Sequence, residues 1–127
     1  LEALEEAGVA ISGAKVAVLG YAYLENSDDT RNSPSAALVA RLETLGAQVA
    51  IHDPYVADYQ GDLAERVRGC DALVIMVAHD RYREVDWRDV ERLMRHAVLV
   101  DGRHVVSDPQ GQAPGFVFRG VGQGRGA

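Results

Sequence analysis

Short apolar runs alternate with amphipathic segments along the chain, and this alternation is what most restricts its fold. The run ALVIMVA at 72–78 contains no polar residue, and KVAVLG at 15–20 ends in glycine. Runs of this kind are typical of parallel strands that are buried on both faces. Three further runs of the same type occupy 47–55, 98–102 and 115–122. We therefore expect about five strands.

Helical patterns lie between these runs. Pro34 suits a first helical position, Ser33 suits the N-cap before it, and Gly46 marks the end of an apolar stripe. Segments 61–71 and 86–97 also show helical patterns. Strands that alternate with helices in this way indicate βαβ units. The predicted fold is α/β, a Rossmann-like doubly wound three-layer sandwich with a mainly parallel sheet.

The chain length predicts a single core. With 127 residues, of which 47% are apolar, the sequence suits one domain. We assign that domain to residues 13–122. Residues 1–12 are interpreted as the tail of a preceding helix, and the glycine-rich residues 123–127 as a frayed terminus.

Composition excludes several classes of function. A net charge of −6 argues against nucleic acid as a partner, because its phosphates require a basic surface. The single cysteine, Cys70, allows no internal disulfide. No stretch is apolar enough for a membrane span, and the acidic beginning does not resemble a signal peptide. We expect a cytoplasmic protein.

A doubly wound sheet binds ligands beyond the carboxyl ends of its strands, where the strand order reverses. Four polar segments follow predicted strands, at 20–33, 52–55, 79–83 and 101–104. The ligand is expected among them.

The segment after the first strand differs from a dinucleotide-binding turn. Its sequence is GYAYLE from Gly20, with one glycine where G-x-G-x-x-G would be needed. Farther along, Arg31 follows Asp28 and Asp29, and a guanidinium beside carboxylates suits an anionic ligand. A solvated loop whose Asp and Asn residues form turns and caps explains these residues equally well.

Four motifs resemble one known family. KVAVLGYAYLENSDDTRNSP is followed by HDPY, by CDALVIMVAHDRYREVDW and by LVDGRHV, in that order, over roughly residues 12–106. Together they closely resemble the C-terminal, UDP-binding domain of the UDP-glucose/GDP-mannose dehydrogenase family. D-D-T-R-x-S-P is the most specific of these motifs.

The resemblance implies an enzyme with several parts. Members of the family oxidise the C6 hydroxyl of a nucleotide-sugar to a carboxylate in two NAD-dependent steps, and the products serve polysaccharide biosynthesis. By this resemblance the chain is the part that holds a UDP-sugar, of the UDP-N-acetylmannosamine or UDP-glucose type. NAD is held mainly by an N-terminal domain, and the catalytic cysteine by a central helical region. Both lie outside this chain, so we expect no catalytic residue here, and we expect a homo-oligomer of the full-length protein.

Three site residues follow from the resemblance alone. Arg103 matches an arginine that contacts the UDP-sugar, in the family typically from a neighbouring subunit, and Tyr23 matches an aromatic residue beside the substrate. Arg31 matches an arginine associated with the NAD site. Leu24 departs from the family, which has a substrate-contacting lysine there, because leucine offers no cation.

Other polar residues have plainer interpretations. Cys70 precedes a buried strand and is expected to be structural. His52, His79 and His104 follow predicted strands without the spacing of a metal site, so we expect hydrogen-bonding roles and no metal. The arginines of 81–95 alternate with acidic residues and indicate a solvated face.

Two other classes of protein share this predicted fold. Asp28 and Asp29 faintly suggest the phosphoacceptor pocket of a receiver domain, but the only lysine, Lys15, is misplaced for one. A stand-alone nucleotide-binding or interaction module without catalysis is the main alternative to a part of an enzyme.

Overall fold

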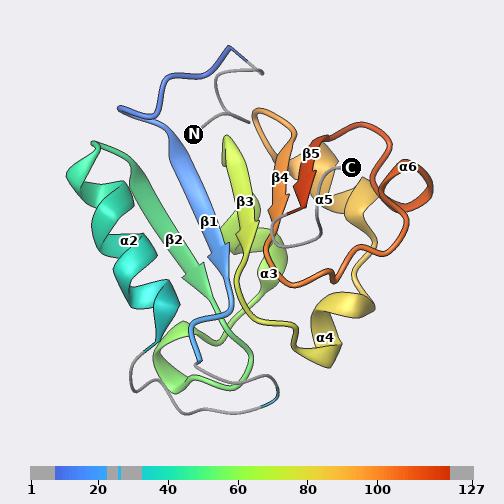
Figure 1. Ribbon diagram of the computed structural model, residues 1–127, viewed down its shortest axis with the longest axis horizontal. Coiled ribbons are helices and arrows are strands. Elements are labelled where there is room, and N and C mark those ends of the chain that lie inside the picture. Colours follow the sequence, from blue (N-terminus) through green and yellow to red (C-terminus); the bar gives the residue numbers. More distant parts are fainter. Residues whose placement is uncertain (1–7, 23–25, 27–32, 121–127) are drawn as a thin grey trace.

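A parallel sheet forms the centre of the computed structural model, which describes residues 8–22, 26 and 33–120 (Figure 1). Its strand order is β2-β1-β3-β4-β5, and every neighbouring pair is parallel. This confirms the predicted α/β fold and its sheet of five strands. The strands are β1 (Lys15–Leu19), β2 (Gln48–His52), β3 (Ala72–Ile75), β4 (Val98–Asp101) and β5 (Val117–Gly120).

Helices cover both faces of the sheet. One face packs against α2 through Leu38, Val39 and Leu42, and the other packs against α3, α4 and α5. Figure 1 shows α2 beside β2, and α3 behind the sheet. The helices are α2 (Pro34–Thr44), α3 (Leu63–Val67), α4 (Asp80–Arg83), α5 (Trp87–Leu93) and α6 (Pro109–Gln112), with a 3₁₀ turn η1 (Ala57–Tyr59).

Side-chain alternation along β1 divides the core between these layers. Val16 and Val18 belong to the cluster under α2, whereas Ala17 and Leu19 belong to the cluster under α3 and α5. All four are at most 1% exposed. A strand that is buried on both faces must be apolar at its buried positions, which explains why β1 is apolar from Val16 to Leu19, after the half-buried Lys15.

The beginning of α2 is fixed as the sequence predicts. Ser33 is the N-cap and its hydroxyl accepts a hydrogen bond from the Ser35 amide, while Pro34 occupies the first turn. The Ser33 hydroxyl also donates to the Tyr21 carbonyl at 2.6 Å. Gly46, with φ of +94°, follows the C-cap residue Leu45. The cap therefore joins the helix to the segment that leaves β1.

The predicted helix over 86–97 is too long, because α5 ends at Leu93. Tertiary contacts draw the following residues away from helical geometry. Arg95 binds the buried Asp71 carboxylate through Nε and Nη2, both at 2.8 Å, and His96 Nδ1 lies 2.7 Å from the same group. The Lys15 amide also donates to it. Burial raises the pKa of Asp71, but these bonds outweigh it and lower the pKa to about 2.

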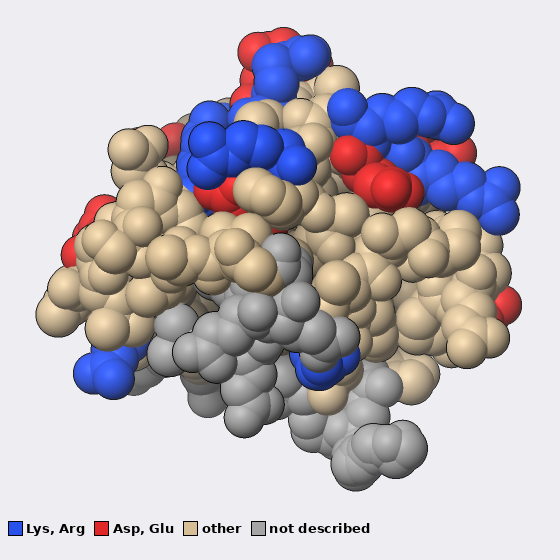
Figure 2. All heavy atoms as spheres, turned by 90° about the horizontal axis from the view of Figure 1, so that it is seen from above, with Lys and Arg blue, Asp and Glu red and all other residues tan. Residues whose placement is uncertain are grey.

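The amino-terminal side of the sheet carries mixed charge. Figure 2 looks onto this side and shows basic and acidic side chains gathered together. The exposed pairs Arg92–Asp89 and Arg68–Glu65 both have i,i+3 spacing. Such pairs contribute less than about 1 kcal/mol each. The exposed pair of Arg92 with Asp89 agrees with the solvated face expected for the arginines of 81–95, whereas Arg95 instead binds the buried Asp71.

Some expected segments differ or lie outside the described residues. The short helices α4 and α6 were not predicted, and each strand is shorter than its apolar run. Residues 8–12 form turns and irregular backbone. Because residues 1–7 and 121–127 lie outside the described residues, the helix tail at 1–12 and the frayed terminus at 123–127 stay predictions.

Gly20 ends β1 in a conformation and a space that both require glycine. Its φ is +98°, and a Cβ built there would lie 2.6 Å from Val77 Cβ and 2.8 Å from the Val77 amide nitrogen. The Gly20 amide donates to the His52 carbonyl at 2.7 Å. The chain segments that leave β1 and β3 are therefore in direct contact.

We predict that Gly20→Ala destabilises the fold by well over about 2 kcal/mol, because backbone strain and a clash with Val77 add together. The matched control is Gly69→Ala, since Gly69 has φ of +74° and no atom within 4 Å of a built Cβ. That change should cost only about 1–2 kcal/mol. Urea denaturation of both variants is the measurement, and equal losses would contradict the close contact.

Candidate functional site

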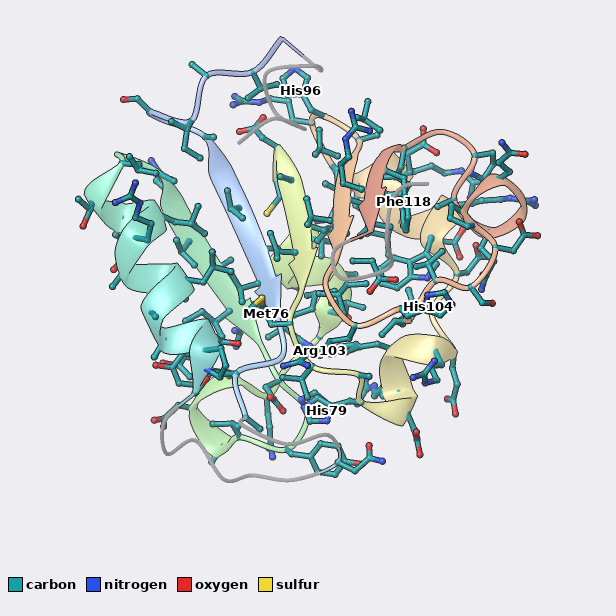
Figure 3. All side chains as sticks on the ribbon, viewed as in Figure 1. Met76, His79, His96, Arg103, His104 and Phe118 are labelled. Atoms are coloured by element: carbon teal, nitrogen blue, oxygen red, sulfur yellow. The ribbon has the colours of Figure 1, made fainter. Side chains whose placement is uncertain are left out.

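Four segments meet at the carboxyl edge of the sheet, because the strands are parallel. In the order β2-β1-β3, the chain leaves β1 toward α2 on one face and leaves β3 toward α4 and α5 on the other. This is the reversal of strand order at which doubly wound sheets bind ligands. In Figure 3, His79, Arg103 and Met76 lie at the lower end of the sheet, whereas His96 lies at the opposite end.

A buried carboxylate organises this edge. Asp53, immediately after β2, is 0% exposed and accepts four hydrogen bonds. Its Oδ2 accepts from the amides of Tyr21 and Ala22 at 2.7 and 2.9 Å and lies 3.0 Å from His79 Nε2. Its Oδ1 accepts from the Tyr55 amide at 2.8 Å. One side chain thus joins the segments that follow β1, β2 and β3.

These bonds decide the charge of Asp53. Burial raises the pKa of the carboxyl group, but the bond to His79 and the three backbone amides outweigh it and lower the pKa to about 2. A carboxylate that accepts several N–H bonds is favoured in its charged form. Asp53 is therefore an anion at neutral pH and accepts from all four groups.

His79 continues the network toward the segment that follows β1. Its ring is 0% exposed, and its Nδ1 lies 2.7 Å from the Asn26 amide nitrogen, which donates to it. The Asn26 side chain in turn accepts from the Asp80 amide at 3.0 Å, at the start of α4. Asn26 has φ of +56°, in the left-handed region that asparagine tolerates better than most residues.

Aromatic rings surround the His79 ring. The Tyr55 ring lies 4.8 Å from it and the Tyr82 ring 5.6 Å, both tilted. At 40% exposure, Tyr55 is an exposed large hydrophobic residue, whereas Tyr82 is fully buried. Tyr55 therefore offers a solvent-facing aromatic surface directly over a buried histidine.

His52 and Tyr82 form a second buried pair. The Tyr82 hydroxyl donates to the His52 carbonyl at 2.8 Å and lies 2.9 Å from His52 Nδ1. Burial lowers the pKa of His52 to about 4, so the ring is neutral at neutral pH. Burial also raises the pKa of Tyr82, which therefore stays protonated. This pair anchors α4 to the end of β2.

Arg103 is held at the end of β4. Asp101 is 0% exposed, and its Oδ1 and Oδ2 accept from the amides of Arg103 and Val106 at 3.0 and 2.7 Å. The exposed Arg103 side chain donates from Nε to the Met76 carbonyl at 2.9 Å. Its two terminal nitrogens make no hydrogen bond or ion pair with the residues that the structure describes. A guanidinium held in this way can bind an anion at the edge of the sheet.

The sequence-predicted site residues have different outcomes. The structure places Arg103 at the predicted edge, beside the segments that contain His79 and Asp53. Tyr23, Leu24 and Arg31 lie outside the described residues, so their roles stay predictions. Sequence reasoning missed Asp53 and Asn26 as individual residues. An aspartate directly after a strand was the available signal for Asp53, since its segment was already among the four expected.

The thiol of Cys70 and the possible metal ligands are the other candidate functional groups in the described part of the chain. Cys70 is buried, its thiol donates to the Arg66 carbonyl at 3.3 Å, and burial raises its pKa to about 11. This agrees with a structural role. Among the described residues, no group of three His, Cys, Asp or Glu side chains is placed to hold a metal ion. No helix in those ranges is long and apolar enough to cross a membrane.

Comparison with models of protein families shows which family this chain belongs to. The model described as "UDP-glucose/GDP-mannose dehydrogenase family, UDP binding domain" matches residues 17–108. The chain belongs to this family. The match confirms the resemblance carried by the four motifs, and it includes every segment of the carboxyl edge described above.

Known relatives and structures of the family agree. A UDP-N-acetyl-D-mannosamine dehydrogenase of Pyrococcus horikoshii is 41% identical over 97% of this chain. A UDP-glucose 6-dehydrogenase of Rhizobium meliloti is 32% identical over 92% of it. The solved P. horikoshii UDP-D-ManNAc dehydrogenase matches with a TM-score of 0.89 over 97% of the chain. An NDP-N-acetyl-D-galactosaminuronic acid dehydrogenase of Methanosarcina mazei matches with 0.87 at 38% identity over 95%.

The chain spans 27–29% of the length of these relatives and solved structures. The described residues that follow β1 differ from a dinucleotide-binding turn. In G-x-G-x-x-G the second glycine lets a pyrophosphate approach the backbone, but Ala22 stands at this place here, is 0% exposed and donates its amide to Asp53. The described residues therefore do not fit NAD at the end of β1.

We predict that Asp53→Asn lowers the free energy of unfolding by about 2–3 kcal/mol, because an amide NH₂ then faces buried N–H donors. The low pKa of Asp53 gives a stabilisation that is fully present above the unfolded pKa. It is lost as the pH falls through the folded pKa of about 2.

The difference between wild type and Asp53→Asn should therefore shrink as the pH falls from about 4 to 2. Denaturant titrations over this pH range measure the difference in the free energy of unfolding. Asp71 titrates in the same range, but its contribution is the same in both proteins and cancels in the difference. The control Asp58→Asn removes an exposed carboxylate from η1 and should change stability by less than about 0.5 kcal/mol. A pH-independent loss in Asp53→Asn would contradict the assignment.

Proposed function

We propose that this chain is the nucleotide-sugar-binding domain of an NAD-dependent nucleotide-sugar 6-dehydrogenase, of the UDP-N-acetylmannosamine or UDP-glucose type. The family match supports this proposal most directly, since its description names UDP binding. The relatives at 41% and 32% identity are described as a UDP-N-acetyl-D-mannosamine dehydrogenase and a UDP-glucose 6-dehydrogenase. The coverage of 29% of each relative fits one domain of a larger enzyme.

In this proposal Arg103 binds the diphosphate of the nucleotide. Its Nε is held by the Met76 carbonyl, so the rotamer is restricted before the ligand arrives, and two terminal nitrogens remain to donate to phosphate oxygens. The buried Asp101 fixes the backbone of the same turn. Tyr23 contributes the aromatic contact to the substrate, and Arg31 contacts the NAD-binding part of the enzyme.

The complete reaction needs more than this chain. Oxidation of an alcohol requires a hydride acceptor within contact distance of the sugar carbon, and NAD supplies that chemistry when it is bound. The described residues do not fit NAD at the end of β1, so we assign it mainly to an N-terminal domain. A central helical region supplies the catalytic cysteine. Full-length subunits associate, and Arg103 reaches the site of the neighbouring copy.

We predict that Arg103→Ala weakens UDP binding by about 1.5–3 kcal/mol, because it removes charge-assisted hydrogen bonds. Calorimetric titration of the full-length enzyme with UDP measures the change, because there the Arg103 of one copy reaches the site of its neighbour. The matched control is Arg92→Ala, which removes an exposed arginine from α5 that is paired only with Asp89 among the described residues. Equal affinities of wild type and Arg103→Ala would remove Arg103 from the site.

We also predict that the chain alone forms no NADH from NAD and UDP-N-acetylmannosamine or UDP-glucose, because only one wall of the reaction site is present. Absorbance of NADH at saturating substrate measures this. Turnover by the isolated chain would contradict the proposal that NAD and the catalytic cysteine are held by other parts of the enzyme. The same assay on the chain joined to its N-terminal and central regions should show activity, and its absence there would argue for a non-catalytic module.

A further inference from the structure

Asp53 and His79 form a buried pair that does not contact the proposed anion-binding arginine, yet it holds the segment after β1. We propose that His79, fixed in one tautomer by Asp53, is a positioning residue for the nucleotide-sugar. His79 holds the Asn26 amide on one side of Tyr23, while Asp53 itself holds the Ala22 amide on the other side. This inference rests on the proposed function, since Tyr23 is the residue expected beside the substrate.

The direction of one hydrogen bond determines the tautomer of His79. A backbone N–H can only donate, and the Asn26 amide lies 2.7 Å from Nδ1, so Nδ1 must be the unprotonated, accepting nitrogen. The ring proton is then on Nε2 and donates to Asp53 at 3.0 Å. Because Asp53 is ionised, it favours this tautomer over the other. The imidazole therefore links the Asn26 amide to Asp53 at the end of β2.

The same carboxylate fixes the other side of Tyr23. The Ala22 amide, directly before Tyr23 in the chain, donates to Asp53 Oδ2 at 2.9 Å. Ala22 and Asn26 are therefore anchored to one carboxylate, Ala22 directly and Asn26 through the His79 ring. Both anchors are buried or partly buried, where hydrogen bonds compete less with water.

Asn26 links this arrangement to α4. Its side-chain oxygen accepts a hydrogen bond from the Asp80 amide in the first turn of α4. His79 is the N-cap residue of α4, but its side chain makes no capping hydrogen bond. His79 instead uses both ring nitrogens in the network around Asp53. Asn26 and His79 therefore connect the segment that follows β1 to the beginning of α4.

Two substitutions of His79 separate the two ring nitrogens. In His79→Asn, the side-chain oxygen can occupy the place of Nδ1 and accept from Asn26, whereas the bond to Asp53 is lost. In His79→Gln, the amide nitrogen can occupy the place of Nε2 and donate to Asp53, whereas the acceptor for Asn26 is lost. The control is His96→Gln, which breaks a His–Asp contact through Nδ1 at the opposite edge of the sheet.

The first measurement needs no ligand. Nitrogen-15 spectra of the wild-type chain should show the His79 proton on Nε2, and hydrogen exchange reports the protection of the Asn26 amide. We expect His79→Gln to accelerate exchange at Asn26 by about tenfold or more, beyond any global change measured at core amides. His79→Asn should retain most of the protection, and His96→Gln should change only the global stability. A proton on Nδ1, or equal protection of Asn26 in both His79 variants, would overturn the positioning role.

The second measurement is the affinity of the full-length enzyme for UDP, because the complete site is shared with other parts of that enzyme. We expect His79→Gln to weaken binding by about tenfold, His79→Asn to recover most of this loss, and His96→Gln to bind as wild type does. If wild type binds UDP and His79→Gln binds equally well, the positioning role is wrong and the proposed function stands. If wild type binds no UDP, the proposed function fails, and the exchange data alone decide whether His79 orders the segment.

Discussion

A buried negative charge at Asp53 is the constraint on which the carboxyl edge depends. An uncompensated buried charge costs several kcal/mol, so its four donors must all be in place in the folded state. Three of them are backbone amides, whose positions are set by the course of the chain rather than by the choice of side chain. The carboxylate therefore specifies where the segments after β1 and β2 run, and His79 extends this control to the segment after β3.

The fold was predictable where local signals agree. Both faces of β1 and β3 are covered, so β3 and residues 16–19 of β1 have no polar position. Ser33, Pro34 and Gly46 mark the ends of α2 in the sequence itself. The end of α5 was not predictable, since Arg95 and His96 leave helical geometry to reach Asp71, which lies more than 20 residues earlier. Helices of four residues such as α4 carry too little periodicity to be recognised.

The location of the candidate site could be predicted from the sequence, but the hydrogen bonds that connect its residues could not. Parallel strands bring their carboxyl ends to one edge, so the amino-acid sequence alone is enough to group the four polar segments. The contacts within the group join Asn26 to His79 and His79 to Asp53 over separations of 53 and 26 residues, which no local pattern encodes. Arg103 was predicted only through the resemblance to a family, because an arginine after D-G has no chemical signature of its own.

Under the proposed function, Arg103 has two tasks at separate atoms, the bond to the Met76 carbonyl and the contact with the ligand. Nε is engaged by the protein, while the two terminal nitrogens, in the same rigid plane, are directed by that engagement. A lysine has a single nitrogen for all of its donors and a flexible stem, so it would have to choose between the carbonyl and a ligand, or hold both with poor geometry. The position thus demands a guanidinium rather than a positive charge alone, and a change from arginine to lysine there would be chemically far from conservative.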